Sequence, residues 1–374
     1  MDCDTRVVFG SSDHLKRVFA RVGRERVPMS GTFDLTFRCN YRCVHCYAGH
    51  LTAQSPAQAA EMNTEQIIEL LTAAADAGCL LLLLSGGEPL LREDFVEIYA
   101  AAKKLGLIVT VFTNASLVED SHLDVFAEFP PHMVEVSVYG VTQATYERVT
   151  GVPGSFRRVR TGIERLLDRG VRVGVKTMIL RDNVEEIGAL EAWARDLHLP
   201  FRVDPLVTPR LNGDLSPLEQ RVDPALAAEL EMGGEESKAE IAKFLSVHEW
   251  DGGEEAVPDD RLYRCGAGTG SFHIDPRGFM HPCLMSAAIA YNAISRGFAD
   301  AWKAVKAEVD QATWDATSEC ATCSNILLCG YCPALFQLED ASPSRPPEYL
   351  CRLGENRFRV LGVQRPEVSR VGSS

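Results

Sequence analysis

The chain has 374 residues, of which 46% are hydrophobic and 24% charged, so it can bury a full core and is expected to form one large and one smaller domain. Its formal net charge of −14 argues against a general nucleic-acid surface and against an anionic-membrane surface. The longest apolar run, Cys79 to Leu84, is far too short to span a bilayer, and residues 1–28 lack the apolar core of a signal peptide. We therefore expect a cytoplasmic protein with neither a nucleic-acid nor a membrane partner.

The chain begins with a segment at residues 1–30 that predicts a basic helix. Apolar residues recur at helical spacing between residues 11 and 22, and lysines and arginines occupy the other side. The basic side serves either to dock a partner or substrate leader, or as a solvated surface. We expect this segment to be too short for a fused leader-recognition domain.

Three cysteines, Cys39, Cys43 and Cys46, follow a β-like run from Thr32 to Phe37. In a reducing compartment, cysteines are read as metal ligands or free thiols before disulfides. A cubic 4Fe-4S cluster normally takes four thiolates, so a loop with three leaves one iron open for a non-protein ligand. The alternative is a zinc knuckle, but three cysteines without a nearby fourth ligand make a poor closed zinc site.

The loop resembles the motif of the radical S-adenosylmethionine (SAM) superfamily, Cys-x3-Cys-x-aromatic-Cys, with His45 in the aromatic position. The resemblance implies that SAM chelates the open iron of a 4Fe-4S cluster. It also implies that an electron, from a donor such as flavodoxin or ferredoxin, cleaves SAM to methionine and a 5′-deoxyadenosyl radical. The predicted enzyme is then an oxidoreductase that abstracts hydrogen from a substrate carbon.

Residues 31–206 alternate short apolar strands with amphipathic helices, which predicts an α/β fold with a parallel sheet. Asn63 with Gln66 and Asn183 with Glu186 predict the caps of two of the helices. The expected strands are Thr32 to Phe37, Leu80 to Leu84, Ile108 to Thr113, Val134 to Val138, Val171 to Met178 and Phe201 to Val203. Six β/α units are too few for an eight-stranded barrel, and they fit the partial (β/α)6 TIM-like barrel that the resemblance implies.

Ligands of parallel α/β folds gather at the carboxyl ends of the strands. The resemblance assigns SAM contacts there to the Gly-Gly-Glu-Pro segment, whose glycines allow close backbone approach. It also places polar groups at the next three strand ends. The resulting cofactor-binding candidates are His45, Gly86, Gly87, Glu88, Pro89, Asn114, Ser137 and Lys176. Tyr139-Gly140 departs from the family, where many relatives have an acidic residue before the glycine, and no catalytic acid or base is identified.

The expected order after the barrel is a bridging segment at residues 207–260, a small cysteine-rich domain at 261–355 and a tail at 356–374. The cysteine pattern resembles the SPASM extension of radical SAM enzymes, except that the last short gap, Cys329-x2-Cys332, is one residue shorter. The resemblance assigns Cys320, Cys323, Cys329 and Cys351 to a distal auxiliary iron-sulfur cluster. It assigns Cys265, Cys283 and Cys332 to a proximal one.

The proximal set has three cysteines for a cluster that usually takes four. An open iron, a non-cysteine ligand and a smaller 2Fe-2S core are the alternatives. Two Cys-x2-Cys pairs are also the pattern of a zinc ribbon. A non-enzymatic metal-stapled binding or electron-transfer module is the corresponding alternative for the whole chain, but it gives no purpose to the Gly-Gly-Glu-Pro segment.

Most SPASM enzymes act on peptides or proteins, so the first functional hypothesis is modification or crosslinking of a ribosomally synthesised peptide or a protein side chain. A separate leader-recognition protein is the expected partner. The alternative is side-chain modification of a tetrapyrrole of the haem pathway, because the sequences around Cys46 and Glu88 are also similar to enzymes that trim haem side chains.

Overall fold

The computed structural model describes residues 21–49, 61–234, 261–315 and 318–363, together with positions 18, 238, 239 and 241. The predicted basic helix at residues 11–22 lies mostly outside the described residues, as does most of the bridging segment after residue 234. Among the described helices, none is long and apolar enough to cross a membrane.

A single nine-stranded sheet organises the fold, in the order β6-β5-β4-β3-β2-β1-β7-β8-β9. The neighbours from β6 to β7 pair in parallel, and β8 and β9 add antiparallel pairings. The strands are β1 Ser30–Asp34, β2 Leu81–Ser85, β3 Ile108–Thr113, β4 Met133–Ser137, β5 Val173–Met178, β6 Phe201–Asp204, β7 Ser271–Ile274, β8 Phe279–His281 and β9 Tyr291–Asn292. The predicted α/β class and partial barrel are confirmed.

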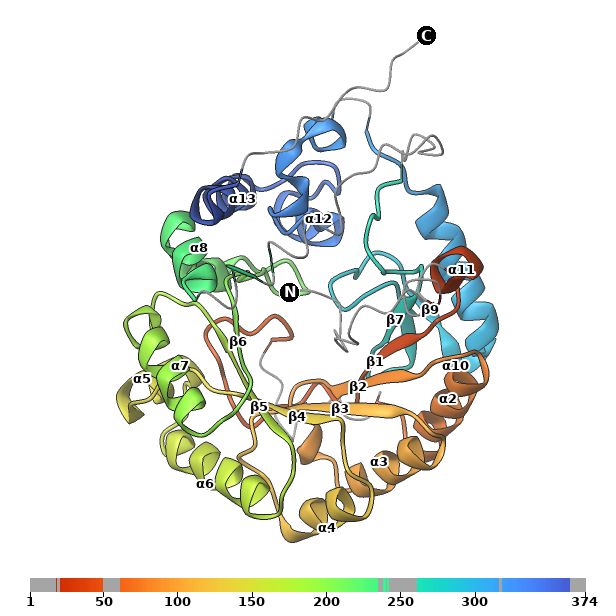
Figure 1. The fold of residues 1–374 in the computed structure, drawn as a ribbon. Coiled ribbons are helices and arrows are strands. Elements are labelled where there is room, and N and C mark those ends of the chain that lie inside the picture. The colour runs from red at the N-terminus through yellow and green to blue at the C-terminus, as the bar shows by residue number, and fades with distance from the viewer. Residues whose placement is uncertain are drawn as a thin grey trace.

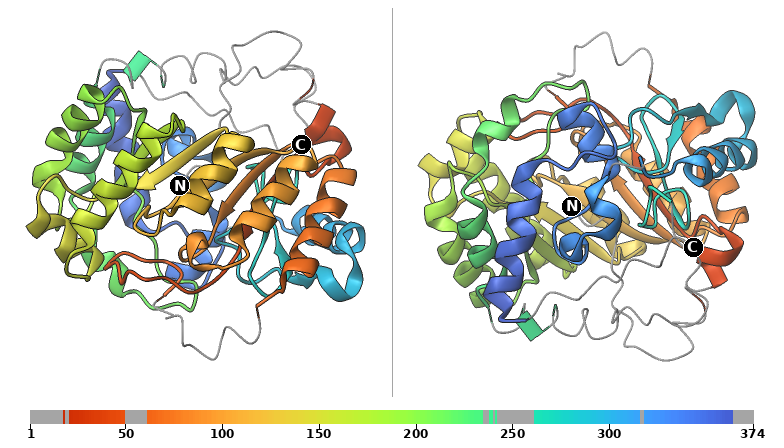
Figure 2. Two further views of the ribbon diagram at one scale, coloured as in Figure 1. Left: turned by 90° about the horizontal axis from the view of Figure 1, so that it is seen from below. Right: turned by 90° about the horizontal axis from the view of Figure 1, so that it is seen from above.

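Helices wrap the outside of this sheet, and the sheet and these helices form an open ring that the C-terminal part of the chain closes (Figure 1). Helices α2 to α7 cover the outer face of β1 to β6, and α11 lies beside β7 to β9 (Figures 1 and 2). The helices are α2 Thr64–Asp76, α3 Phe95–Lys104, α4 Asp120–Glu128, α5 Gln143–Thr150, α6 Ser155–Asp168, α7 Ile187–Asp196, α8 Pro224–Met232, α10 Ala293–Arg296, α11 Phe298–Gln311, α12 Pro333–Asp340 and α13 Glu348–Leu361.

Side chains alternate between the two faces of the sheet, as the two-residue period of a strand requires. The outward set, with Val109, Val111, Val134 and Val136 in β3 and β4, is fully buried against the helices. The inward set forms what we call the lumen face. The register places on it Thr32, Asp34, Phe112, Glu135, Ser137, Lys176, Arg202, Asp204, His273 and His281.

The capping box of Asn63 and Gln66 is confirmed, because each side chain accepts from the other's backbone N–H. The second predicted cap is wrong. Asn183 instead precedes a 3-10 turn, and its side chain accepts from the backbone N–H of Leu180. Glu186 turns away to accept hydrogen bonds from the loop after β4, at Val141 and Thr142.

The first strand ends earlier than predicted, at Asp34 and not at Phe37. Leu35 still donates its backbone N–H to Ser85, but the chain then leaves the sheet because side chains of other segments take its polar groups. β7 was not predicted as a strand. It pairs directly with β1, so the cysteine-rich C-terminal part of the chain extends the barrel sheet.

Candidate functional site: three cysteine groups around the barrel

The Cys39–Cys46 loop leaves the carboxyl end of β1 and is held by backbone hydrogen bonds to a neighbouring element. Arg42 and Val44 donate their N–H groups to Thr150 and Val149 at the end of α5, at 2.9 and 3.0 Å. On the other side, Arg210 Nε donates to the Cys46 carbonyl at 3.4 Å while its guanidinium pairs with Asp214. The loop is thereby fixed between the barrel and the segment that follows β6.

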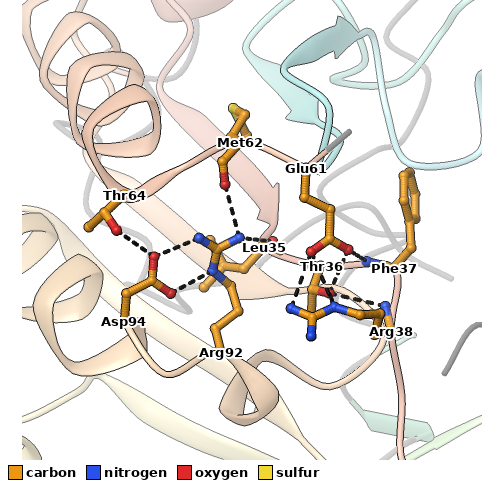
Figure 3. A network of polar contacts seen from close by, with 9 residues as sticks. All are labelled: Leu35, Thr36, Phe37, Arg38, Glu61, Met62, Thr64, Arg92 and Asp94. Atoms are coloured by element: carbon orange, nitrogen blue, oxygen red, sulfur yellow. Dashed lines mark hydrogen bonds and ion pairs between the residues drawn. The ribbon is translucent and has the colours of Figure 1, made fainter. Parts of the chain in front are cut away.

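Figure 3 shows a second set of anchors, on the four residues that lead from β1 to Cys39. The buried Glu61 carboxylate accepts from Thr36 Oγ1 at 2.7 Å and from the Phe37 N–H at 3.0 Å, and it pairs with Arg38 at 3.3 Å. Arg92 donates to the Leu35 carbonyl at 3.0 Å. Sequence reasoning missed Glu61, because nothing in its local pattern signals a contact with residues more than 20 positions earlier.

The three thiols of this loop fit an iron-sulfur cluster by their chemistry. Burial raises the pKa of Cys39 to about 12, and the charges of Glu88 and Cys46 act in the same direction. Burial also raises the pKa of Cys43, and the thiolate charges of Cys46 and Cys39 add to the shift. The three sulfurs are therefore close enough to repel one another when ionised. Bound iron is the positive charge that would let them ionise together.

The Gly-Gly-Glu-Pro turn packs directly on the cysteine loop. A Cβ on Gly86 would lie 2.5 Å from the Thr36 carbonyl oxygen, and one on Gly87 would overlap the carbonyl of Arg38. The close approach allows Gly87 and Glu88 to donate their N–H groups to Thr36 and Arg38, at 2.8 and 2.9 Å. The glycines therefore have a structural role, besides the SAM contact that the sequence predicts for them.

The Glu88 carboxylate is fully buried and links the ends of β2 and β3. It accepts hydrogen bonds from Thr113 Oγ1 and the Asn114 N–H, both at 2.7 Å, and from the Leu90 N–H at 3.1 Å. Burial raises its pKa to about 7, against these hydrogen bonds. Through them Glu88 sets the position of Asn114. Pro89 is buried at the start of the following 3-10 turn.

Asn114 reaches the cysteine loop. Its Nδ2 donates to Asn40 Oδ1 at 2.8 Å and lies 4.0 Å from Cys39 Sγ. Asn40 in turn donates to Ser116. This chain of amides places a predicted cofactor-binding residue beside a predicted metal ligand, which is the arrangement expected of a shared site.

The other predicted cofactor contacts are more scattered. His45 packs edge-to-face on Tyr139, with ring centroids 4.7 Å apart, and burial lowers its pKa to about 4. Lys176 is buried on the lumen face, with Nζ 2.9 Å from the centre of the Phe112 ring, and burial lowers its pKa well below the usual value. Ser137 is its partner across β4 and β5. His45 is part of the cysteine loop itself, whereas Lys176 and Ser137 border the lumen and form no hydrogen bond with that loop among the described residues.

Two further arginines near the lumen form ion pairs. Arg202 pairs with Glu135 across the lumen face at 3.0 Å, and Arg210 with Asp214 at 2.7 Å.

The four predicted ligands of the distal cluster gather around the 3-10 turns η5 (Glu319–Thr322) and η6 (Ser324–Leu327) and α13. Burial raises the pKa of Cys329 to about 12, and the thiolate charges of Cys320, Cys323 and Cys351 add to the shift. Gly354 lets α13 pack on Cys329, since a Cβ there would lie 2.8 Å from the Cys329 Cα. The structure thus brings together four cysteines that are up to 31 positions apart in sequence.

The predicted proximal ligands meet around Tyr263. Burial raises the pKa of the Tyr263 phenol to about 12, and the charges of Cys283, Cys332 and Cys265 add to the shift. Across the described residues, no three His, Cys, Asp or Glu side chains are arranged to chelate a single metal ion. A cubic cluster carries its thiolates on separate irons, so its ligands need not meet at one point.

Comparison with known proteins gives a match to the radical SAM superfamily over residues 34–194. An AdoMet-dependent heme synthase of Methanosarcina barkeri is 28% identical over 84% of this chain and 93% of its own length. A PqqA peptide cyclase of Gluconobacter oxydans is 31% identical, but the match covers 46% of this chain and 47% of that protein. The chain thus spans about half the length of that second relative.

Two solved structures share the fold at low sequence identity. Streptococcus suis SuiB bound to the precursor peptide SuiA has a TM-score of 0.66 and 16% identity, over 93% of this chain and 83% of that one. The anSMEcpe structure with bound AdoMet and the Cp18Cys peptide has a TM-score of 0.60 and 16% identity, over 89% and 96%. The family match and the curated relatives, which are enzymes, confirm the predicted enzyme class, and the two structures show the fold.

Proposed function

Because the match over residues 34–194 makes this chain a radical SAM enzyme, with a 4Fe-4S cluster and SAM as cofactors, we propose that it modifies or crosslinks a ribosomally synthesised peptide. When bound, these cofactors supply a 5′-deoxyadenosyl radical that takes a hydrogen atom from an unactivated carbon. The protein's part is to hold the cofactors, orient the substrate carbon and exclude water.

Cys39, Cys43 and Cys46 would hold the cluster that binds SAM. Glu61 and Arg92 hold the chain that leads to these cysteines, and Glu88 holds Asn114 beside Cys39. Asn114 is thus placed to donate a hydrogen bond to a cluster sulfur or to SAM. These contacts orient the ligands through a rigid outer shell, as metal sites require.

The two C-terminal cysteine groups would hold auxiliary iron-sulfur clusters. Cys320, Cys323, Cys329 and Cys351 provide the four thiolates of a complete distal site. Cys265, Cys283 and Cys332 provide three, all of them near enough to the Tyr263 phenol to raise its pKa. We assign both groups by the chemistry of their donors and by their grouping in space.

The charged residues of the lumen face support a peptide, and not a tetrapyrrole, as the substrate. Its carboxylates are Asp34, Glu135 and Asp204, and its cations are Lys176 and Arg202, of which Arg202 is already paired with Glu135. An acidic surface favours substrates that bring N–H donors and cations, as peptides do. It disfavours a tetrapyrrole whose side chains are carboxylates, because like charges repel.

A tetrapyrrole is the second candidate. The heme synthase of M. barkeri supports it, because that alignment covers nearly the whole of both chains. On this alternative, the buried Lys176 would pair with a substrate carboxylate.

Separate assays with a tetrapyrrole and with peptides distinguish the two candidates. The holoenzyme, reconstituted without oxygen, would receive SAM and dithionite with either Fe-coproporphyrin III or a library of short synthetic peptides. We expect deoxyadenosine formation coupled to a peptide that has lost hydrogen mass, and no carbon dioxide from the tetrapyrrole. Carbon dioxide from Fe-coproporphyrin III with unchanged peptides would establish the second candidate instead.

A further inference from the structure

Among the residues that the structure describes, two buried side chains on the lumen face each have a polar atom without a hydrogen-bond partner. Asp34, at the end of β1, and His273, on the adjacent β7, are each only 4% exposed, yet Asp34 Oδ1 and His273 Nδ1 accept or donate no hydrogen bond. Leaving a buried polar atom unpaired costs about 1–3 kcal/mol. Such atoms are rare in native proteins and often mark a functional position.

The two side chains face each other. β1 and β7 pair in parallel with Thr32 opposite His273, and His273 Nε2 lies 3.7 Å from Asp34 Oδ2. Burial lowers the pKa of His273 to about 3, so the imidazole is neutral and carries one N–H. With that proton on Nε2, toward the carboxylate, Nδ1 is an acceptor. The pair then presents two acceptors, Asp34 Oδ1 and His273 Nδ1.

Three ionisable groups near this pair have other contacts. Asp275, which follows β7, accepts from the Arg277 guanidinium at 2.6 Å and from the Phe279 N–H at 3.0 Å. His281 Nδ1 lies 3.0 Å from the carbonyl oxygens of Ser286 and Ile289. Lys176, the cation that acts on Asp34 from β5, lies over the Phe112 ring.

The charges around Asp34 favour the binding of a cation beside it. Burial raises the pKa of Asp34 to about 7, and the charge of Asp275 adds to the shift while Lys176 opposes it. A bound cation would reverse the cost of ionising Asp34 and would fill both acceptors. Hydrogen bonds between a charged donor and a carboxylate are stronger than neutral ones.

We propose that Asp34 and His273 bind a cationic hydrogen-bond donor of the substrate, namely the ammonium group of a lysine or the guanidinium group of an arginine in the peptide. The inference rests on the proposed peptide function and deepens it. Asp34 stands five positions before Cys39, so the bound side chain would anchor the peptide on the lumen face next to the cysteine loop.

The test uses the SAM-bound holoenzyme and four pools of N-acetylated, C-amidated hexapeptides. The pools are random except for one fixed residue, which is Lys, Arg, Ala or Glu, and retained peptides are counted by mass spectrometry. We expect the Lys and Arg pools to be retained about tenfold better than the Ala and Glu pools, the ratio for one charge-assisted hydrogen bond. Asp34→Asn should abolish the preference, and His273→Gln should reduce it.

Glu135→Gln is the matched control, because it removes a lumen carboxylate that Arg202 already pairs; it should keep the preference. Circular dichroism and iron content establish whether each variant is folded. If Asp34→Asn does not fold, the loss of preference is tested with His273→Gln alone. An unchanged preference in Asp34→Asn, or no preference in the wild type, would overturn the proposal.

Deoxyadenosine formation, measured at several SAM concentrations, distinguishes a peptide subsite from a SAM contact and from a failure of the proposed function. A raised KM for SAM in Asp34→Asn would assign the carboxylate to SAM and would also overturn the proposal. A protein that makes deoxyadenosine but shows no pool preference contradicts the subsite alone. A protein that makes no deoxyadenosine contradicts the proposed function itself.

Discussion

At the scale of single residues, the barrel buries several charges whose ionisation opposes folding. Asp34 is the clearest case, because its pKa of about 7 lies well above the value of about 4 in an unfolded chain. Between these values the unfolded state has lost a proton that the folded state retains. The contribution of this group to stability therefore falls as pH rises from about 4 to about 7.

Replacing Asp34 by Asn should remove that pH dependence. The penalty in the wild type is at most about 4 kcal/mol at pH 8, so the melting temperature of Asp34→Asn relative to the wild type should rise from pH 5 to pH 8. Thermal unfolding at both pH values measures this difference in melting temperature. Asp300→Asn, at an exposed position, is the control. A constant difference between variant and wild type would mean that the Asp34 pKa is not raised.

Glu61 illustrates a residue whose importance is visible only in three dimensions. Glu61→Ala leaves the buried Arg38 without its partner, which should cost about 3–5 kcal/mol, as breaking a buried ion pair does. It also leaves Thr36 Oγ1 and the Phe37 N–H without their acceptor. The segment that leads to Cys39 is then less well held, so the reconstituted protein should lose iron from the first cluster. Iron content and thermal unfolding check this, with the exposed Glu97→Ala on α3 as control. Full iron content in Glu61→Ala would show that the loop holds its shape without this anchor.

At the scale of elements, the contact between the Gly-Gly-Glu-Pro turn and the cysteine loop determines the geometry of the site. Gly87→Ala should push the turn away from Arg38 and break two backbone hydrogen bonds. We expect weaker SAM binding and lower iron content. Gly188→Ala is the matched control, because a Cβ there meets nothing within 4 Å. Equal SAM affinity in Gly87→Ala and the control would contradict a shared turn and loop.

Much of the barrel could be predicted, because its strands and helices carry their own periodicity. Ile108 to Thr113 was predicted with the bounds that it has. β7 could not be, because its four residues gain their strand character from pairing with β1, some 240 positions away. For the same reason, sequence patterns identified Glu88 and Asn114 at strand ends but not Glu61, Asp34 or His273, whose roles depend on distant partners.

At the scale of the whole molecule, the C-terminal part closes the ring opposite β3 and β4, where α8 and α13 lie side by side (Figure 1). Arg357 on α13 ties these parts together, since it pairs with Glu231 on α8 and donates to the Leu328 carbonyl beside Cys329. The distal cysteine group is therefore anchored to the segment that follows the barrel.

Arg357→Met should loosen the distal cysteine group and leave the barrel intact. We expect iron content to fall by about one cluster, about four iron atoms, while SAM is still cleaved to deoxyadenosine. The exposed pair of Arg359 and Glu229 provides a control, Arg359→Met, that should change neither quantity. Loss of SAM cleavage together with the iron would mean that barrel and C-terminal part fold as one unit.

The central claim is that Cys39, Cys43 and Cys46 hold the cluster at which SAM is cleaved. The most direct test measures iron per chain and deoxyadenosine from SAM plus dithionite, for the anaerobically reconstituted wild type and a variant with all three cysteines changed to Ala. We predict about 10 to 12 iron atoms in the wild type, about four fewer in the variant, and deoxyadenosine from the wild type only. Deoxyadenosine from the variant, or zinc in place of iron in a wild type that cleaves no SAM, would contradict the account.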